Sequence, residues 1–409
     1  MANASHFPYF ISKRIRSKAT GRFSATIQRI GIGSIAVGLA VMIVSQFILG
    51  GFRETIQEKI FSFGAHVLVT KYSNSNSYDE NPVEAENHLY LHPEEYEYVE
   101  HVQPFSNKAA LLKTDEEVQG VIMKGVNPDF DTARFAPNLL EGRFIEWKDS
   151  TYAEEILISR KLANLLRLSV NDRVLVYFVQ NPPRTRRVTV VGIYSTSMED
   201  FDDKFILGDL GLLQHLNNWG DSLVGGFEVY LTDFDDLQEG KASMLSQTDY
   251  NLSVQGVTDR YPQLFDWLML LDRNELILLV IVLFVASFNM ISILLILIME
   301  RTSMIGLLKA LGTTDGQIRN IFLYNAQYLI VRGLAWGNGL ALLIAFLQYQ
   351  FQIIPLDPEN YYMEYVPILW DWPAVIFLNV ATIVLVNLVL LIPVVIVSRI
   401  TPVRSLRFH

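Results

Sequence analysis

The stretch from Glu300 to Gly312 combines apolar and basic side chains in a pattern that suggests contact with a partner more than catalysis. A short helix is expected at about residues 303–311, with side chains that are nearly all apolar apart from Lys309. An exposed apolar helix implies a partner protein or burial in a membrane interface. The alternative is a turn that only covers neighbouring helices, and spacing alone leaves both interpretations open.

Two local signals set the limits of this helix. Gly312 lies where the C-terminus of a helix needs a residue in the left-handed region. Thr314 and Gln317 have the spacing of a capping box, which predicts that another helix begins there. The stretch is therefore expected to form a separate short helix between two longer ones.

Motifs that bind nucleotides or metals are weak in this chain. It contains no Gly-x-x-x-x-Gly-Lys-Ser/Thr motif, so it cannot bind ATP through a P-loop. Residues 31–36 fit a loose dinucleotide-binding pattern, but they follow no predicted strand, which argues against that interpretation. His88 and His92 have the spacing of metal ligands on a helix, but Pro93 and a loop-like setting argue against a metal site.

Catalytic groups are equally hard to find. Glu199, Asp200, Asp202 and Asp203 lie close together, yet such acidic runs are more often solvated loops than catalytic pairs. The chain has no cysteine, which excludes thiol catalysis and cysteine metal sites. The sequence therefore predicts no catalytic residue, no metal site and no cofactor bound by this chain itself.

The elements that position these residues include four apolar runs, each long enough to cross a membrane. A helix needs about 20 residues to cross about 30 Å of hydrocarbon. The runs cover Ile30–Leu49, Leu276–Met299, Tyr324–Leu347 and Val375–Val397. The last three helices are expected at about 276–299, 321–348 and 374–397. The first run is longer than the apolar region of a cleaved signal peptide, so we expect a retained span.

Charge placement sets the orientation of the chain in the membrane. Basic residues without acids precede the first run, and Arg399, Arg404 and Arg407 lie near the end of the chain. Cytoplasmic loops carry such an excess of Lys and Arg, so both termini and residues 300–319 are expected in the cytoplasm. Residues 53–275 hold 20 Lys and Arg against 37 Asp and Glu, a net charge of −17. This acidity argues against nucleic acid as a partner.

The predicted fold is a membrane protein with four transmembrane α-helices and a large α+β extracytoplasmic domain inserted between helices 1 and 2. Three parts are expected: residues 1–51, with a cytoplasmic amphipathic helix and the first span; residues 52–272, the extracytoplasmic domain; and residues 273–409, with the last three spans. Strands are expected at 66–70, 119–123, 155–158, 173–179, 187–194, 205–207 and 226–231, and helices at 52–63, 160–166 and 210–216.

The first part begins with a pattern typical of an interfacial helix. Phe7, Phe10, Ile11 and Ile15 fall on one helical face, while basic residues lie elsewhere around it. Such a helix would lie on an anionic cytoplasmic leaflet and end near Gly21. The alternative is a solvated basic tail.

Some polar and small residues inside the spans are expected to join neighbouring helices, and one charged residue is a candidate for a functional role. Asn289 lies in mid-span, where an amide commonly bonds to a neighbouring helix. Gly333, Gly337 and Gly339 would allow close helix packing. Arg332 is a functional candidate because charges are costly in a membrane, although it could instead extend to the interface.

A loop between two strand patterns is the second candidate binding element. Residues 179–186 are expected to form a projecting loop with a basic tip, stiffened by Pro182 and Pro183 and including Gln180 and Arg184. An ordinary hairpin loop is the alternative.

The order of these parts and several motifs resemble the FtsX/MacB superfamily of ABC transporter permeases. The most specific segment combines Phe288–Ser292, Glu300–Gly312 and Gln317–Phe322. The chain is most similar to the LolC/LolE lipoprotein-releasing branch, through Gly50–Phe52, Pro355–Pro358 and Pro402–Arg407. The resemblance implies a MacB-like core domain at 52–272 and an FtsX-like domain at 273–409.

The resemblance also implies partners and site residues. A separate cytoplasmic ATPase dimer of the LolD type would bind ATP and magnesium and dock on a coupling helix. The residues implied for that helix are Arg301, Met304, Ile305, Gly306, Leu308, Lys309, Leu311 and Gly312. The other partners would be a second permease subunit, in a homodimer or heterodimer, membrane lipids, a lipoprotein substrate and a periplasmic carrier of the LolA type.

The implied function is the extraction of lipoproteins from the outer leaflet of the bacterial inner membrane for transfer to that carrier. The loop containing Gln180, Pro182, Pro183 and Arg184 lies where one member of the branch holds the carrier, but it is short here. The alternatives are efflux of a peptide or amphiphile, and a role without transport in which the external domain activates a cell-wall hydrolase.

Overall fold

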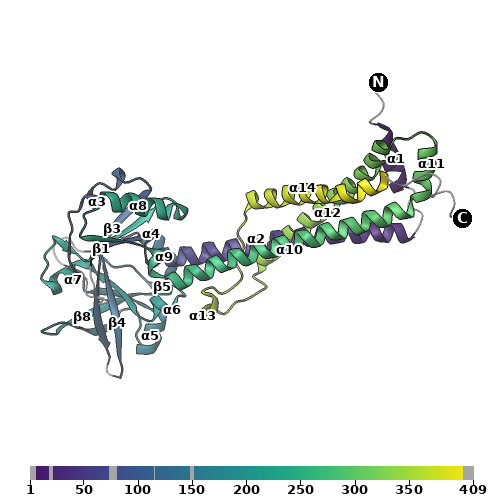
Figure 1. The fold of residues 1–409 in the computed structure, drawn as a ribbon. Coiled ribbons are helices and arrows are strands. Elements are labelled where there is room, and N and C mark those ends of the chain that lie inside the picture. Colours follow the sequence, from purple (N-terminus) through teal and green to yellow (C-terminus); the bar gives the residue numbers. More distant parts are fainter. Residues whose placement is uncertain (1–5, 18–21, 73–80, 115, 148–151, 399–409) are drawn as a thin grey trace. The chain divides into compact units, whose positions relative to one another are not determined.

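The computed structural model describes residues 6–17, 22–72, 81–114, 116–147 and 152–398. These residues form two compact units, which Figure 1 draws in one view. Met1–Glu54, Trp267–Pro355 and Tyr365–His409 make up the first unit, called here the helical unit. Thr55–Asp266 and Leu356–Glu364 make up the second, called here the α+β unit.

Four long helices dominate the helical unit. They are α2 (Arg22–Phe63), α10 (Pro262–Glu300), α12 (Asp315–Phe351) and α14 (Trp372–Ser398). In the described part of the chain, these are the helices long and apolar enough to cross a membrane. The fold class predicted from the sequence, four spans with an α+β domain between the first and second, is confirmed.

Helices α2 and α10 are much longer than a span requires. They contain 42 and 39 residues, or about 60 Å of helix at 1.5 Å per residue, against about 30 Å of hydrocarbon. The prediction that the first span continues as helix to Phe63 is confirmed, and the contacts of residues 55–63 place them in the α+β unit. Helix α2 therefore has residues in both units.

The core of the helical unit is built where α2 and α12 approach closely. A Cβ on Gly333 would lie 2.7 Å from Cβ of Ile35, and one on Gly337 would lie 2.9 Å from the carbonyl oxygen of Ala36. Gly339 has no atom within 4 Å of such a Cβ, so the predicted packing role of that glycine is wrong. Gly333 and Gly337 lie on the buried face of α12 and Gly339 does not, because the helix turns about 100° per residue.

These glycines give a stability prediction with a matched control. Gly333→Ala should lower the thermal unfolding midpoint of the detergent-purified chain, because overpacking costs about 1–3 kcal/mol. Gly339→Ala should leave the midpoint unchanged or raise it, because alanine favours helix by up to about 1 kcal/mol. Equal midpoints for the two variants would contradict the close approach of α2 and α12.

Polar side chains also join the spans. Asn289 on α10 donates to Ser34 Oγ on α2 at 2.7 Å. Asn338 on α12 and Asn379 on α14 exchange two amide hydrogen bonds of 2.8 and 3.0 Å. Bonds of this kind are typically worth about 0.6–2 kcal/mol in a membrane, so they help to fix which helix faces meet.

The N-terminal helix α1 (His6–Ser17) packs against α12, with the rings of Tyr9 and Tyr324 edge to face at 5.8 Å. Phe7 and Phe10 remain exposed. The helix is thus held by the bundle and presents aromatic side chains outward, which argues against a freely solvated tail. The predicted end near Gly21 and the side chain of Ile15 lie outside the described residues.

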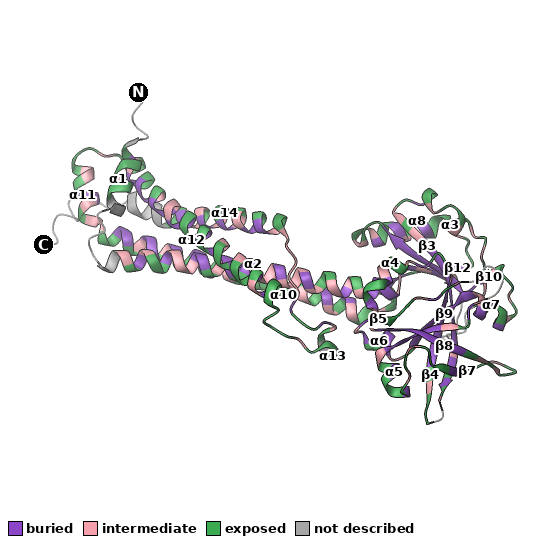
Figure 2. Ribbon diagram, turned by 180° about the vertical axis from the view of Figure 1, so that it is seen from behind, coloured by how far each residue is buried: buried purple, intermediate pink, exposed green. Residues whose placement is uncertain are grey.

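The α+β unit is built on one sheet with a closed portion. Among the described residues, nine of its ten strands follow the order β12-β1-β11-β3-β4-β9-β6-β8-β5. Strand β7 pairs with both β3 and β8, so the path from β3 through β4, β9 and β6 to β8 closes on itself. Apolar side chains from this ring and from α5 and α7 fill its core, and Figure 2 shows the buried strands.

The sheet strands are β1 (Val67–Lys71), β3 (Val99–Lys113), β4 (Val118–Val126), β5 (Leu139–Gly142), β6 (Glu155–Ser159), β7 (Arg173–Phe178), β8 (Arg184–Tyr194), β9 (Phe205–Asp209), β11 (Gly226–Leu231) and β12 (Leu252–Gly256). Strands β2 (Val83–Glu84) and β10 (Leu223–Val224) pair with each other. The seven predicted strands correspond to β1, β4, β6, β7, β8, β9 and β11. Strand β3, which is 15 residues long, was not predicted.

The remaining helices are short. They are α3 (His88–Leu91), α4 (Thr132–Phe135), α5 (Arg160–Leu166), α6 (Glu199–Asp202), α7 (Leu210–Asn217), α8 (Leu237–Gln247), α9 (Val257–Arg260), α11 (Thr302–Ala310) and α13 (Pro358–Tyr361), with 3₁₀ turns at Pro93–Glu95, Ala136–Asn138 and Phe234–Asp236. The two short helices predicted in the external domain correspond to α5 and α7.

Candidate functional site

Helix α11 lies between the two spans α10 and α12, and its ends are set by local hydrogen bonds. Gly312 has a φ of 90°, as predicted for the residue after a helix C-terminus. Thr314 Oγ1 accepts from the backbone N–H of Gln317 at 3.4 Å, and Gln317 Oε1 accepts from that of Thr314 at 3.1 Å. The predicted capping box is confirmed, and α11 is a separate element with a sharp turn on either side.

Burial divides the residues of α11 into an anchoring face and an outer face. Ile305 and Gly306 are buried, and Ile305 belongs to the core of the helical unit. Arg301, Met304 and Leu308 are half-buried. Leu307, and Leu311 just after the last helical residue, lie four residues apart and are 55% and 75% exposed. A partner helix could therefore contact Leu307 and Leu311 directly, while Ile305 holds the helix in place.

The exposed residues of the outer face of α11 are only partly those predicted for the coupling helix. Leu307 was not among them, although its spacing from Leu311 would have identified it once the buried face was known. Ile305 and Gly306 were among them but are inaccessible to a partner. Lys309 forms an ion pair with Asp315 at 2.8 Å, so its charge is directed to the start of α12.

The external end of α2 is held by a buried lysine. Lys124 on β4 donates to the carbonyl oxygen of Phe63 at 2.5 Å and to Oε1 of Glu228 at 2.7 Å. Gln103 donates to the other carboxylate oxygen at 2.8 Å. The Phe63 carbonyl is among the last of α2, which have no partner within the helix. The lysine therefore joins the helix end to three neighbouring strands of the sheet.

Aromatic packing surrounds the same helix end. The ring of Phe63 stacks on Phe201 at 4.8 Å and lies 5.4 Å from Phe205. Ser62 accepts a hydrogen bond of 2.7 Å from Asn138. Because the end of α2 is packed and hydrogen-bonded on several sides, it belongs rigidly to the α+β unit.

His66, just beyond α2, links the helix end to strand β11. Its Nδ1 accepts from the backbone N–H of Leu231 at 2.7 Å, and its ring lies edge to face with Phe61 at 4.1 Å. Burial, with a further contribution from the charge of Arg134, lowers the pKa of His66 to about 4. The imidazole is therefore neutral in the folded protein at neutral pH.

A depressed histidine pKa makes stability depend on pH. The native state favours the neutral ring of His66. The contribution of this ring to the free energy of unfolding, about 3 kcal/mol, is therefore complete above about pH 6.5 and is lost as the pH falls towards 4. Replacing His66 by Asn keeps an acceptor for Leu231 but removes the titration. Chemical unfolding at pH 7 and pH 4.5 should show a smaller acid loss for His66→Asn than for the wild type, and equal losses would contradict this assignment.

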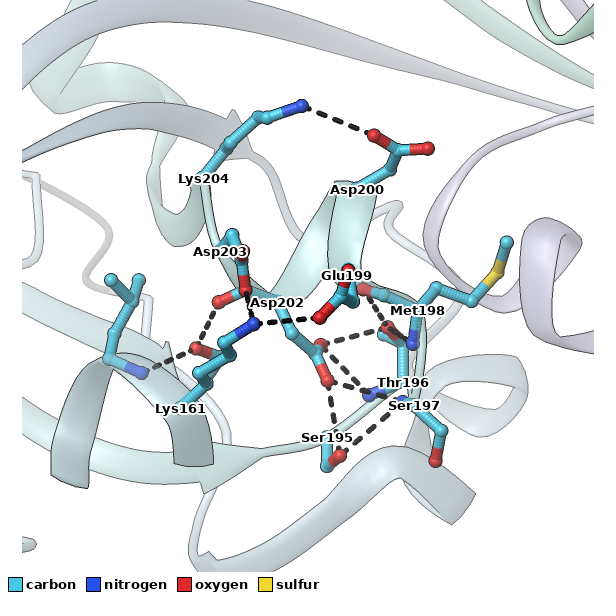
Figure 3. Close-up of polar contacts among 12 residues, drawn as sticks. Lys161, Ser195, Thr196, Ser197, Met198, Glu199, Asp200, Asp202, Asp203 and Lys204 are labelled. Atoms are coloured by element: carbon cyan, nitrogen blue, oxygen red, sulfur yellow. Dashed lines mark hydrogen bonds and ion pairs between the residues drawn. The ribbon is translucent and has the colours of Figure 1, made fainter. Parts of the chain in front are cut away.

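The acidic cluster at residues 199–203 is structural (Figure 3). Asp202 is buried, and its carboxylate accepts four hydrogen bonds from residues 195–197, two of them from Thr196 at 2.8 and 3.0 Å. Lys161 pairs with Glu199 and Asp203 at 3.0 and 2.7 Å. These partners raise the pKa of Lys161. The carboxylates fix a turn and a surface helix and are not arranged as a catalytic pair.

Other candidates from the sequence have ordinary partners. His88 and His92 lie near Glu95 and Glu94 at 3.6 and 3.4 Å, in surface pairs. In the described part of the chain, no group of three or more metal-binding side chains gathers. Arg332 lies over the ring of Tyr328 at 4.6 Å, a cation–π contact.

The predicted projecting loop is shorter than its sequence suggested. Strand β8 begins at Arg184, so the loop contains only residues 179–183. The guanidinium of Arg184 donates to the carbonyl oxygens of His215 and Leu216 at 3.3 and 2.9 Å. The expectation of a basic tip that includes Arg184 is wrong, because this arginine binds the end of α7.

An open groove of about 920 Å³ lies elsewhere on the α+β unit. Its lining includes Tyr90, Tyr152, Asp209 and His215. Burial raises the pKa of Asp209, but its carboxylate accepts backbone hydrogen bonds from Ala153 and Gly211 and caps α7. The groove therefore offers contact surface and no evident catalytic group.

Comparison with known proteins covers almost the whole chain. The MacB-like periplasmic core domain matches residues 32–247, and the FtsX-like permease C-terminal domain matches residues 276–402. The lipoprotein-releasing system transmembrane protein LolC of Neisseria meningitidis is 22% identical over 416 residues, with 97% of each chain covered. The corresponding LolE protein of Haemophilus influenzae is 22% identical, with 98% of this chain and 99% of the relative covered.

Two solved structures are also similar to part of the chain. The extracellular domain of the ABC-type transporter YknZ from Gram-positive bacteria is 15% identical, with a TM-score of 0.31, and covers 46% of this chain and 100% of its own. The periplasmic region of MacB from Actinobacillus actinomycetemcomitans is 12% identical, with a TM-score of 0.35, and covers 51% and 95% respectively.

Proposed function

Because the chain belongs to the family of permeases that combine a MacB-like periplasmic core domain with an FtsX-like C-terminal domain, we propose that it is an ABC transporter subunit that extracts lipoproteins from the outer leaflet of the inner membrane. The observation that carries this proposal is the near full-length similarity to relatives named lipoprotein-releasing LolC and LolE. The chain hands each lipoprotein to a soluble periplasmic carrier.

The energy for this extraction comes from a separate ATPase. Each CH₂ group that leaves the membrane costs about 0.8 kcal/mol, so removing several acyl chains requires an energy source. The chain has no P-loop, and a cytoplasmic ATPase dimer that binds ATP and magnesium supplies the work. The ATPase docks on the outer face of α11, for which exposed Leu307 and Leu311 provide the apolar contact.

Helices α2 and α10 transmit the movement that the ATPase produces to the external domain. Closure of the ATPase dimer displaces α11 and the spans next to it, and a second permease subunit faces this one across the complex. The unbroken length of α2 supports this route, and Lys124 anchors the last turn of α2 within the α+β unit. The loop at residues 179–183 is the proposed contact for the carrier, with Gln180, Pro182 and Pro183 on it and Arg184 fixing its base.

Purification of the native complex in mild detergent, followed by identification of the bound proteins, tests this function. We expect a P-loop ATPase, a permease subunit and acylated lipoproteins. Recovery of a cell-wall hydrolase in place of lipoproteins would indicate the role without transport. Recovery of an efflux partner without lipoproteins would indicate export of a peptide or amphiphile.

A further inference from the structure

The segment that connects α12 to α14 lies deeper along the spans than a simple external loop would. The backbone N–H of Leu369 donates to the carbonyl oxygen of Phe47 on α2 at 3.0 Å. Phe47 precedes Arg53 by six residues, or about 9 Å along the helix towards the membrane. Arg53, which ends the charge-free run of α2, lies 3.9 Å from Asp272 of α10. At Leu369 the connecting segment therefore lies closer to the middle of the span than Arg53 and Asp272 do.

Two glycines of α2 make room for this return. A Cβ on Gly51 would lie 2.9 Å from the carbonyl carbon of Pro367, and one on Gly50 would lie 3.2 Å from Leu369. The ring of Trp370 then lies 5.4 Å from that of Phe47 and 6.2 Å from that of Trp372. Tryptophan and tyrosine are enriched where a membrane meets water, so this cluster marks the outer membrane interface.

Several backbone polar groups in and beside residues 351–354, called here the stem of the connecting segment, are paired. Gln348, which is buried near the end of α12, accepts from the N–H of Ile354 at 3.1 Å and donates to the carbonyl of Val366 at 3.0 Å. The N–H of Val366 donates to the carbonyl of Ile354 at 3.2 Å, and Pro355 pairs with Tyr365. Such pairing is required of irregular backbone at membrane depth, where water cannot satisfy it.

Apart from Gln352, the side chains of residues 351–354 are apolar, and all four are exposed. Phe351, Ile353 and Ile354 are 65%, 61% and 50% exposed, and Trp372 is 53% exposed. No charged residue occurs in 333–356 or in 365–370, and Asp371, between Trp370 and Trp372, accepts from the backbone N–H of Ala374 at 2.9 Å. This surface continues the apolar outer surface of α14, where Ile376 is equally exposed.

We propose that residues 351–354, with Tyr365 and Trp372, form a stem that is inserted in the outer leaflet of the membrane. Its partner is the lipid surface at the level where acyl chains meet head groups. The depth of Leu369, the backbone pairing, the aromatic border and the continuity with a span support lipid over water as this partner. The stem belongs to the helical unit, and the inference does not depend on which substrate the permease moves.

The absence of cysteine from the chain allows a direct test by site-directed spin labelling. The variant Ile353→Cys carries the label in the stem, Ile376→Cys carries it on the membrane-facing surface of α14, and Tyr250→Cys carries it at a fully exposed site of the α+β unit. The full chain is reconstituted in vesicles of phosphatidylcholine and phosphatidylglycerol. Collision rates are measured with oxygen, which concentrates in lipid, and with a water-soluble nickel chelate.

The label at residue 353 should behave as the label at residue 376 does, with oxygen collisions exceeding nickel collisions. A preference for nickel, as expected at residue 250, would overturn the proposal. Shielding from both reagents would also overturn it, because that result would indicate a covering protein chain. Ile354→Cys provides a second stem variant if the first label disturbs the fold.

Discussion

Replacing Leu307 by Asp is expected to abolish recovery of the ATPase with the solubilised permease. Leu307 is 55% exposed on the outer face of α11, while the opposite face of the helix is held in the core. Burying a leucine side chain contributes about 1.5–3 kcal/mol, and an unpaired carboxylate at the same place adds a desolvation cost. A combined loss above about 3 kcal/mol weakens binding more than 100-fold. Co-purification followed by quantification of the ATPase measures this loss.

A matched variant separates loss of docking from general disturbance of the chain. Leu245 on α8 is 60% exposed, in the α+β unit. Leu245→Asp makes the same chemical change at similar exposure on the other side of the membrane, so it should leave ATPase recovery unchanged. Normal recovery with Leu307→Asp would rule out Leu307 as part of the docking face. Leu308→Asp should have a smaller effect, because Leu308 is half-buried beside that face.

Replacing Lys124 by Met is expected to destabilise the α+β unit by about 3–5 kcal/mol. The substitution leaves the carboxylate of Glu228 buried without its cation and the Phe63 carbonyl without its donor. For a domain of this size, that loss lowers the thermal midpoint by roughly 6–20 °C. Circular dichroism of the full chain during heating in detergent measures the midpoint.

Two further variants test the cause of this destabilisation. Lys124→Met combined with Glu228→Gln removes both charges and keeps an acceptor for Gln103, so it should recover much of the loss. Lys161→Met removes a surface lysine with two carboxylate partners and should cost no more than about 1 kcal/mol. Equal losses of stability for Lys124→Met and Lys161→Met would show that the buried pair of Lys124 and Glu228 stabilises the α+β unit no more than a surface pair does.

The sequence predicted the spans well because a membrane imposes a simple pattern. Charge-free apolar runs of about 20 residues match the thickness of a bilayer and are longer than most core helices need. Gly312 and the pair Thr314 and Gln317 were equally informative, because left-handed backbone and capping boxes depend on local chemistry. The exposed face of α11 was not predictable, since it depends on which side Ile305 buries against the bundle.

Strand β3 shows why part of the external domain could not be predicted. Its central residues are buried on both faces, and four of them, Gln103, Ser106, Asn107 and Lys108, are polar. A strand recognised by alternating apolar and polar residues would not show this composition. The partners that make burial possible, such as Glu228 for Gln103, lie more than 100 residues away in the chain.

The depth of residues 366–370 along the spans could not be predicted for the same reason, because it depends on contacts with residues far away in the chain. The sequence of this segment reads as a short apolar run before a span, and only the contacts of Leu369 and Pro367 with α2 reveal its depth. The glycines at positions 50 and 51 were noted as a family feature, but what they accommodate was not evident from the sequence.

ATP-driven release of a radiolabelled lipoprotein from proteoliposomes is the most direct test of the proposed function. The vesicles contain this chain, its partner permease and the ATPase, and the soluble carrier is added outside on the side of the α+β unit. The account predicts that lipoprotein moves to the soluble fraction with ATP and stays in the membrane without it. Lipoprotein that remains in the membrane fraction while the ATPase is fully active would contradict the account.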